Sequence, residues 1–216
     1  MRAMILAAGR GKRMGTLTED TPKPLLRVQG NYLIEYMIRH LASANIKEMV
    51  INVFYHAEQI KSALGDGSRY GVNIIYSEEK ECLETGGGVF KALPHLGSNP
   101  FLVVSSDIIT DYPLQNLPQE PAGLAHLVMV TNPSYHPKGD FGLKEGRLDL
   151  HSEPLLTFGN ICVFKPELFA DCTQGHFRLT KLLLPAISAG KMTGEHYQGL
   201  WYNIGTPEDL AEVNKL

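Results

Sequence analysis

The sequence lacks the features that mark secreted and membrane proteins. It contains only three cysteines, Cys82, Cys162 and Cys172, and none of them has Cys-x-x-Cys spacing. An odd number of isolated cysteines excludes a disulfide framework or a zinc knot and favours a reducing compartment. No apolar run approaches the roughly 18 residues of a membrane span, and the first apolar stretch is too short for a signal peptide. We therefore expect a cytoplasmic protein without a membrane partner.

An excess of positive charge is also missing. The 20 Lys and Arg residues stand against 23 Asp and Glu residues, which leaves a net charge of −3. Such a chain has no bulk positive field to attract nucleic acid. Any phosphate that it binds must be held by a few well-placed cations, and we expect no nucleic-acid partner.

Several common catalytic motifs are absent as well. The chain has neither a His-Glu-x-x-His zinc motif nor a Gly-x-Ser-x-Gly nucleophile elbow. The dinucleotide fingerprint would need glycine at Met14, and the phosphate-binding P-loop would need Ser or Thr at Arg13. The lack of an evident base suits a reaction whose nucleophile is a phosphate monoester, because that group is already anionic near neutral pH.

The apolar pattern of the first half predicts strands that alternate with helices. A composition of 44% apolar and 20% charged residues can fill a core. Strands separated by helices imply right-handed crossovers and a mostly parallel sheet covered on both faces, which is an α/β fold. The predicted strands are 4–8, 49–53, 72–76 and 101–104, and the predicted helices are 33–41, 57–64 and 87–93, the last ending before Pro94.

The pattern changes after Asp107, and the second half contains more Gly, Pro and charge. We expect one α/β domain over residues 1–216, with its second half specialised for a ligand. The final helix should begin at Pro207 and be capped by Thr206. The other predicted elements are strands 124–130, 159–164 and 194–204, a hairpin within 141–150, and a helix at 178–189 that Pro185 would kink.

Two basic segments near the N-terminus predict a phosphate site. Gly9-Arg10-Gly11-Lys12-Arg13 directly follows the first predicted strand, where glycines let backbone N–H groups approach an anion. Lys23 lies between Pro22 and Pro24, and Pro24 favours an extended backbone at Lys23. A lysine on such a stiffened loop suits a phosphate target.

Asp107 predicts the place of a metal ion. It ends the strand at Ser105-Ser106-Asp107, and ligands bind at the carboxyl ends of strands in open α/β sheets. A carboxylate there suits Mg²⁺, which takes one or two carboxylates together with substrate phosphates. Helix capping is the competing role for Asp107, and Asp111 is either a second ligand or a turn residue.

These segments resemble a known signature. Residues 6–14 (LAAGRGKRM) and 21–25 (TPKPL) are similar to the signature of the sugar-phosphate nucleotidylyltransferases, and Asp107 and the GTPE sequence at 205–208 extend the likeness over essentially the whole chain. The resemblance implies a Rossmann-like, GT-A-like three-layer core with a mixed, mostly parallel sheet and helices on both faces. It also implies transfer of a nucleoside monophosphate from an NTP to a sugar 1-phosphate, with release of pyrophosphate. The nucleotide would bind to the half of the domain formed by about residues 1–110, and the sugar to the half formed by about residues 111–216.

Three further segments narrow the expected substrates. The sequences at 83–88 (LETGGG), 139–141 (GDF) and 194–197 (GEHY) resemble members of the family that use UTP and N-acetylmuramic acid 1-phosphate in cell-wall recycling. GTP with mannose 1-phosphate and dTTP with glucose 1-phosphate are the alternatives within the family. The oligomeric state is not predicted.

The resemblance also implies roles for single residues. Arg13 would contact the β- and γ-phosphates, Lys23 would bridge the α-phosphate and the sugar phosphate, and Asp107 would bind Mg²⁺ as the third catalytic residue. The loop from Ser77 to Gly86 would reach the base. Asp140, Glu153 and Asn160 would face the sugar. The expected nucleotide-binding residues are Leu6, Ala7, Ala8, Gly9, Gly11, Lys12, Arg13, Lys23, Ser77, Gly86 and Ser105.

One position departs from the family pattern. Asn203 stands where family members have an aspartate as the second metal ligand. An amide oxygen can coordinate Mg²⁺ but brings no charge, so a non-catalytic module that senses a nucleotide sugar is a competing hypothesis. A glycosyltransferase ranks last, because Ser105-Ser106-Asp107 lacks the first acid of an Asp-x-Asp motif.

Overall fold

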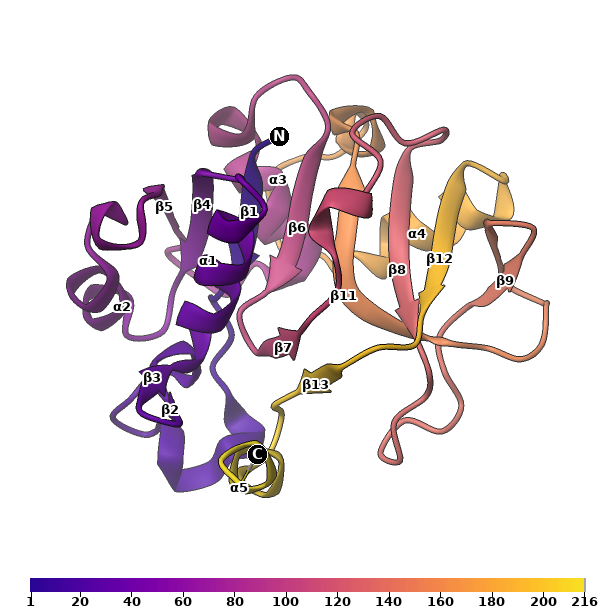
Figure 1. Ribbon diagram of the computed structural model, residues 1–216. Coiled ribbons are helices and arrows are strands. Elements are labelled where there is room, and N and C mark those ends of the chain that lie inside the picture. Colours follow the sequence, from indigo (N-terminus) through magenta and orange to yellow (C-terminus); the bar gives the residue numbers. More distant parts are fainter. Residues whose placement is uncertain (216) are drawn as a thin grey trace.

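A mixed sheet of nine strands runs through the protein (Figure 1). The computed structural model describes residues 1–215. The strands of this sheet are β1 (Ala3–Leu6), β4 (Glu48–Val53), β5 (Asn73–Glu78), β6 (Phe101–Ser105), β8 (Ala125–Val130), β9 (Gly142–Lys144), β10 (Arg147–Asp149), β11 (Thr157–Phe164) and β12 (Met192–Tyr197). Their order is β5-β4-β1-β6-β11-β8-β12-β10-β9. Only β11 and β10 run against the other strands of this sheet, which confirms the predicted mixed, mostly parallel sheet.

Helices cover both faces of this sheet, as predicted. The helices are α1 (Leu33–Ser43), α2 (Ala57–Leu64), α3 (Glu84–Leu96) and α4 (Thr180–Ser188). Successive residues of a strand point to opposite faces, so Ile5 packs with α1 and α2 in one apolar cluster, while Met4 packs with α3 and α4 in the other. The apolar stripe of α1 and the apolar side chains of α3 thus bury the two faces of the sheet.

A third apolar cluster joins the two ends of the chain. The last helix, α5 (Pro207–Val213), packs against the short turn η1 (Lys12–Thr18) and the ribbon of β2 (Arg27–Val28) and β3 (Asn31–Tyr32) (Figure 1). Its predicted start is confirmed, because Asp209 N donates to the capping Thr206 Oγ1 at 3.3 Å. The buried members of this cluster are Met14, Leu26, Val28, Leu33, Ile204 and Val213.

Two predicted elements are wrong in their extent. The helix predicted to stop before Pro94 continues to Leu96, because a proline in the last turn removes only one N–H donor from the helix. The strand predicted at 194–204 divides into β12 and a separate strand, β13 (Trp201–Asn203). The chain leaves the large sheet after Tyr197, and β13 pairs instead with β7 (Ile108–Thr110).

The first strand ends at Leu6 and not at residue 8 as predicted, the other predicted elements are present, and the rest of the described structure includes short turns. The predicted hairpin within 141–150 is formed by β9 and β10, and Pro185 lies inside α4. Among residues 1–215, no helix has the length and apolar character needed to cross a membrane. The short turns are η2 (Lys23–Leu25), η3 (Ser68–Tyr70), η4 (Leu114–Asn116) and η5 (Pro166–Phe169).

Candidate active site

The loop after β1 lines a cavity of about 380 Å³. We call it the first cavity. It lies at the carboxyl ends of β1, β4 and β6, where an open α/β sheet binds its ligands. Nine of the residues predicted to bind the nucleotide line it, together with Asp107: Leu6, Ala7, Ala8, Gly9, Gly11, Lys12, Arg13, Lys23 and Ser105.

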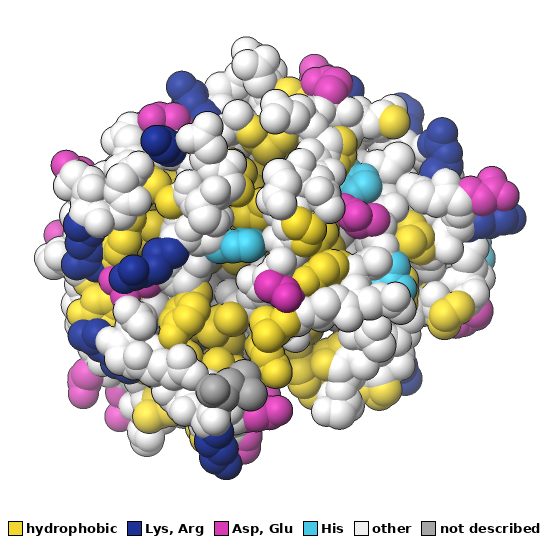
Figure 2. All heavy atoms as spheres, viewed as in Figure 1, with side chains coloured by type: hydrophobic (Ala, Val, Ile, Leu, Met, Phe, Trp, Pro, Cys, Tyr) yellow, Lys and Arg dark blue, Asp and Glu magenta, His cyan; other side chains and the backbone are white. Residues whose placement is uncertain are grey.

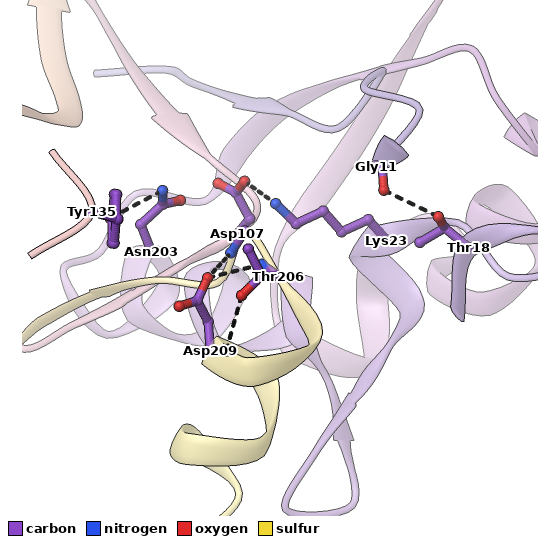
Figure 3. Close-up of polar contacts among 9 residues, drawn as sticks. Gly11, Thr18, Lys23, Asp107, Tyr135, Asn203, Thr206 and Asp209 are labelled. Carbon is purple, nitrogen blue, oxygen red and sulfur yellow. Dashed lines mark hydrogen bonds and ion pairs between the residues drawn. The ribbon is translucent and has the colours of Figure 1, made fainter. Parts of the chain in front are cut away.

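Gly11 shapes this loop. Its φ of +64° is the left-handed conformation that favours glycine, and a Cβ atom there would lie 3.0 Å from Lys23 Cβ. Thr18 Oγ1 donates to Gly11 O at 3.1 Å and closes the turn (Figure 3). The loop therefore packs directly against the stem of Lys23.

Lys23 reaches from this loop to Asp107. The lysine begins the turn η2 and is not extended as predicted, because Leu26 N donates to Lys23 O at 3.1 Å and bends the chain there. Lys23 Nζ donates to Asp107 Oδ2 at 2.5 Å (Figure 3). The two side chains are 12% and 24% exposed, so the pair is partly shielded from water but open to the cavity.

Arg13 faces a turn that α5 stabilises. A Cβ atom at Gly205 would lie 3.1 Å from both terminal nitrogens of the guanidinium, so Arg13 packs closely against the backbone of Gly205. Asp209 Oδ2 accepts hydrogen bonds from Gly205 N and Thr206 N, each at 2.8 Å (Figure 3). The C-terminal helix thus fixes the surface on which the Arg13 guanidinium lies.

A second cavity of about 400 Å³ adjoins the first at Arg13, which lines both. Asp140 and Asn160, both predicted to face the sugar, line this second cavity. Asp140 Oδ2 accepts a hydrogen bond from Phe158 N at 2.8 Å, and Asp140 Oδ1 lies 3.1 Å from His136 Nε2. The other lining residues are Tyr135, Phe141, Thr157, Thr180, Leu183, Trp201 and Asn203.

Asn160 has a strained backbone. Its φ is +57°, a left-handed value inside the strand β11, where the register with β8 shifts between Phe158 and Cys162. Left-handed conformations of residues other than glycine cost free energy and cluster at functional sites. The register shift of β11 accounts for this conformation, and the ligand role of Asn160 stays a prediction.

Asp107 and Asn203 lie side by side where the cavities meet. Figure 3 shows the two side chains next to each other. Asn203 pairs with Ile108 across β13 and β7, and Ile204 N donates to Asp107 O at 2.8 Å. Asn203 Nδ2 donates to the Tyr135 hydroxyl at 3.3 Å, which leaves the amide oxygen as an acceptor.

One carboxylate and one amide oxygen form a donor set that fits Mg²⁺, provided that phosphates and water supply the other ligands. Within residues 1–215, His, Cys, Asp and Glu side chains form no group of three or more that would cage a metal. The residues present therefore fit an ion that is bound together with its phosphates.

Comparison with known proteins decides the family. The family model for "Nucleotidyl transferase" matches residues 2–147. The chain belongs to the nucleotidyl transferase family. It is 42% identical to an N-acetylmuramate alpha-1-phosphate uridylyltransferase of Neisseria meningitidis, with 100% of this chain and 98% of that protein covered. It is 33% identical to a protein of the same name from Caulobacter vibrioides, with 95% and 92% covered.

A solved structure shows the same fold. The inositol-1-phosphate CTP transferase from T. maritima superposes with a TM-score of 0.81 at 20% sequence identity, over 99% of this chain and 94% of that one. Membership of the nucleotidyl transferase family makes the chain an enzyme, and the shared fold accounts for the Rossmann-like core.

Three predicted residues of this nucleotidyl transferase lie away from the two cavities. Ser77 is 3% exposed within β5. Gly86 packs against Phe177, whose ring carbon lies 2.5 Å from the position of a Cβ atom on Gly86. Glu153 Oε2 accepts a hydrogen bond from Leu155 N at 3.3 Å within its own loop.

A buried polar pair was missed at the floor of the first cavity. Ala7 N donates to Asn52 Oδ1 at 2.9 Å, and Asn52 Nδ2 donates to Glu79 Oε1 at 2.7 Å. Glu79 Oε2 accepts from Leu83 N at 3.1 Å, and burial raises the pKa of Glu79. The available signal was a polar residue inside an apolar strand, Val50-Ile51-Asn52-Val53. Pro24 and Gly205 also line this cavity and were not predicted. The remaining lining residues are Ser106 and three members of the segment 77–86 that was expected to reach the base: Cys82, Glu84 and Thr85.

Proposed function

We propose that the protein transfers UMP from UTP to N-acetylmuramic acid 1-phosphate, giving the UDP-sugar and pyrophosphate. The observation that carries the proposal is the position of Arg13, which lines both cavities next to Gly205. Two substrates that react must meet, and the cations needed for their phosphates lie where the cavities adjoin. The names of the two full-length relatives support the choice of UTP and of this sugar.

The reaction needs no protein base. An oxygen of the sugar 1-phosphate attacks the α-phosphorus of UTP, the new O–P bond forms, and the bond to the β-phosphate oxygen breaks. Both reacting groups are anions, so the work of the protein is to align them and to offset their repulsion. Arg13 and Lys23 supply positive charge at the junction, and backbone N–H groups of the glycine loop bind the triphosphate.

We assign the metal to Asp107 and Asn203. Bound Mg²⁺ would neutralise charge on the phosphates as pyrophosphate departs. Lys23 is paired with Asp107 Oδ2, so Asp107 holds the lysine at the mouth of the phosphate site. Lys23 would contact the phosphates there, and Asp107 would hold the ion that offsets their charge. We propose the cytoplasm as the compartment, which the free thiols of Cys82, Cys162 and Cys172 suit.

A matrix of substrates tests the proposal. Pyrophosphate release is measured with each of UTP, GTP, dTTP and CTP against the 1-phosphates of N-acetylmuramic acid, N-acetylglucosamine, glucose and mannose, with Mg²⁺ or with EDTA. We expect the fastest release with UTP and N-acetylmuramic acid 1-phosphate, and none with EDTA.

Other outcomes identify the competing functions. Fastest release with GTP and mannose 1-phosphate, or with dTTP and glucose 1-phosphate, would replace the substrate pair and keep the reaction. Calorimetric binding of a nucleotide sugar without any release would instead indicate a sensing module.

A further inference from the structure

The strand β13 presents two side chains to the second cavity. Trp201 and Asn203 lie two residues apart on the same face of the strand, and both line this cavity. Tyr202 between them packs on the third apolar cluster. Trp201 Nε1 also donates to Gly159 O at 2.9 Å. The position of this one short strand therefore places an aromatic ring and an amide in the predicted sugar site.

Asp111 holds the entry to β13. Its Oδ1 accepts a hydrogen bond from Leu200 N at 2.8 Å, and its own N–H donates to Leu200 O at 3.3 Å. Thr110 Oγ1 donates to the same Leu200 carbonyl at 2.7 Å. The backbone of Leu200 is thus bound on both sides just before β13 begins.

Tyr197 ties Asp111 to the core of the protein. Its hydroxyl donates to Asp111 Oδ1, and its ring packs edge-on against Tyr112 with centroids 5.1 Å apart. Tyr112 is 1% exposed, its hydroxyl donates to Glu195, and its carbonyl lies 2.8 Å from His40 Nε2. Figure 2 shows histidine and acidic side chains on this face of the molecule.

Charge favours this arrangement at neutral pH. The hydrogen bond from Tyr197 lowers the pKa of Asp111, and burial raises the pKa of Tyr197 to about 12. Asp111 is therefore an ionised acceptor and Tyr197 a protonated donor, which makes the bond charge-assisted.

We propose that Asp111 is a positioning residue for the sugar 1-phosphate: by fixing Leu200, it sets where β13 presents Trp201 and Asn203. The substrate named in this inference rests on the proposed function, whereas the claim that Asp111 holds β13 through Leu200 does not. Asp111 lines neither cavity, so it acts through β13 and not by contact with the substrate.

The single tryptophan of the chain, Trp201, reports on β13 without any turnover. Acrylamide quenching of its fluorescence is measured for Asp111→Ala, Asp111→Asn and Tyr197→Phe. We expect greater quenching in Asp111→Ala, a smaller increase in Tyr197→Phe, and partial rescue in Asp111→Asn, whose amide oxygen can still accept from Leu200 N. Asp66→Ala is the matched control, since Asp66 is also exposed and accepts from a nearby backbone N–H, that of Ser68.

Steady-state kinetics test the functional part. Loss of a hydrogen bond to a charged group changes an equilibrium about tenfold or more, so Asp111→Ala should raise KM for the sugar 1-phosphate about tenfold. KM for UTP, measured at saturating Mg²⁺, should change by less than about twofold, because the first cavity does not include β13 and saturating Mg²⁺ offsets a weaker contact of the ion with Asn203. A merely structural role would raise both KM values together.

Three results would overturn the proposal. Quenching of Trp201 in Asp111→Ala equal to that in Asp66→Ala would show that Asp111 does not hold β13. An equal rise in both KM values, or no change in either, would show that β13 does not select the sugar position. If the unaltered protein released no pyrophosphate with any sugar 1-phosphate, the proposed function would fail, and the quenching series would still decide the role of Asp111.

Discussion

The two cavities are built in different ways. Seven of the eighteen residues that line the first come from one contiguous segment, residues 6–13, which begins at the end of a parallel strand. The second is formed by side chains from segments around Tyr135, Asp140, Phe158, Thr180 and Trp201, which meet only in the folded protein. A phosphate chain common to all nucleotides suits a backbone cradle, whereas one sugar among many must be selected by side chains.

The cavities also differ in charge. Lys12, Arg13 and Lys23 line the first cavity, and only Arg13 of these extends into the second. The second cavity offers aromatic rings, amides and the Asp140–His136 pair instead. Substitutions at the junction should therefore impair chemistry, and substitutions in either cavity should impair one substrate.

The largest effect should follow loss of Lys23, the cation that is paired with Asp107 in the first cavity. Lys23→Met should lower kcat about a thousandfold, because one charged donor to the reacting phosphates is removed. Pyrophosphate release at saturating substrates measures it. Lys61→Met is the matched control, since Lys61 is also paired with acidic side chains, Glu58 and Glu78, but lies on α2 away from both cavities. Full turnover in Lys23→Met would refute the mechanism.

Loss of Arg13 should impair the use of both substrates, because its side chain lines both cavities. Arg13→Gln should lower kcat/KM about a hundredfold for each substrate, since a charged donor shared by both is lost. The measurement is a pair of titrations, one varying UTP and one varying the sugar 1-phosphate. A loss confined to one titration would mean that the cavities act separately.

Asp140 should affect only the sugar. Asp140→Ala should raise KM for the sugar 1-phosphate about tenfold, because a charged acceptor is lost and Phe158 N loses its partner. KM for UTP should stay unchanged in the same assay. Asp149→Ala is the control, since Asp149 accepts from backbone N–H groups of His151 and Ser152 and lines neither cavity. An equal rise in both KM values would argue against the division of the site.

The smallest effect should come from Asn203. Asn203→Asp adds a negative charge beside Asp107 and should lower the Mg²⁺ concentration for half-maximal rate about fivefold. A Mg²⁺ titration of pyrophosphate release measures it, with Asn45→Asp as the control on an exposed turn. An unchanged Mg²⁺ dependence would mean that residue 203 does not serve the ion.

The same contrast explains what the sequence could predict. The glycine loop, Lys23 and Asp107 were found because their signals are local: glycines after an apolar strand, a lysine between prolines, and an acid at a strand end. The α/β class follows from equally local periodicity. These features depend on neighbours in sequence, so spacing alone reveals them.

The rest depends on contacts between distant residues. Asn52 is bound to Glu79, which lies 27 residues away, and Trp201 reaches the second cavity only because β13 leaves the large sheet to pair with β7. Glu153 was assigned to the sugar by the family resemblance, and its side chain lines neither cavity. Position 86 requires glycine because the Phe177 ring occupies the space that a side chain would need.

The packing of α5 against η1 has a consequence for synthesis of the chain. The loop that carries Arg13 is synthesised long before the turn at Gly205, against which its guanidinium lies. A nascent chain that has reached only β12 therefore holds an incomplete phosphate site. The phosphate site is complete only after Gly205 and α5 have been synthesised.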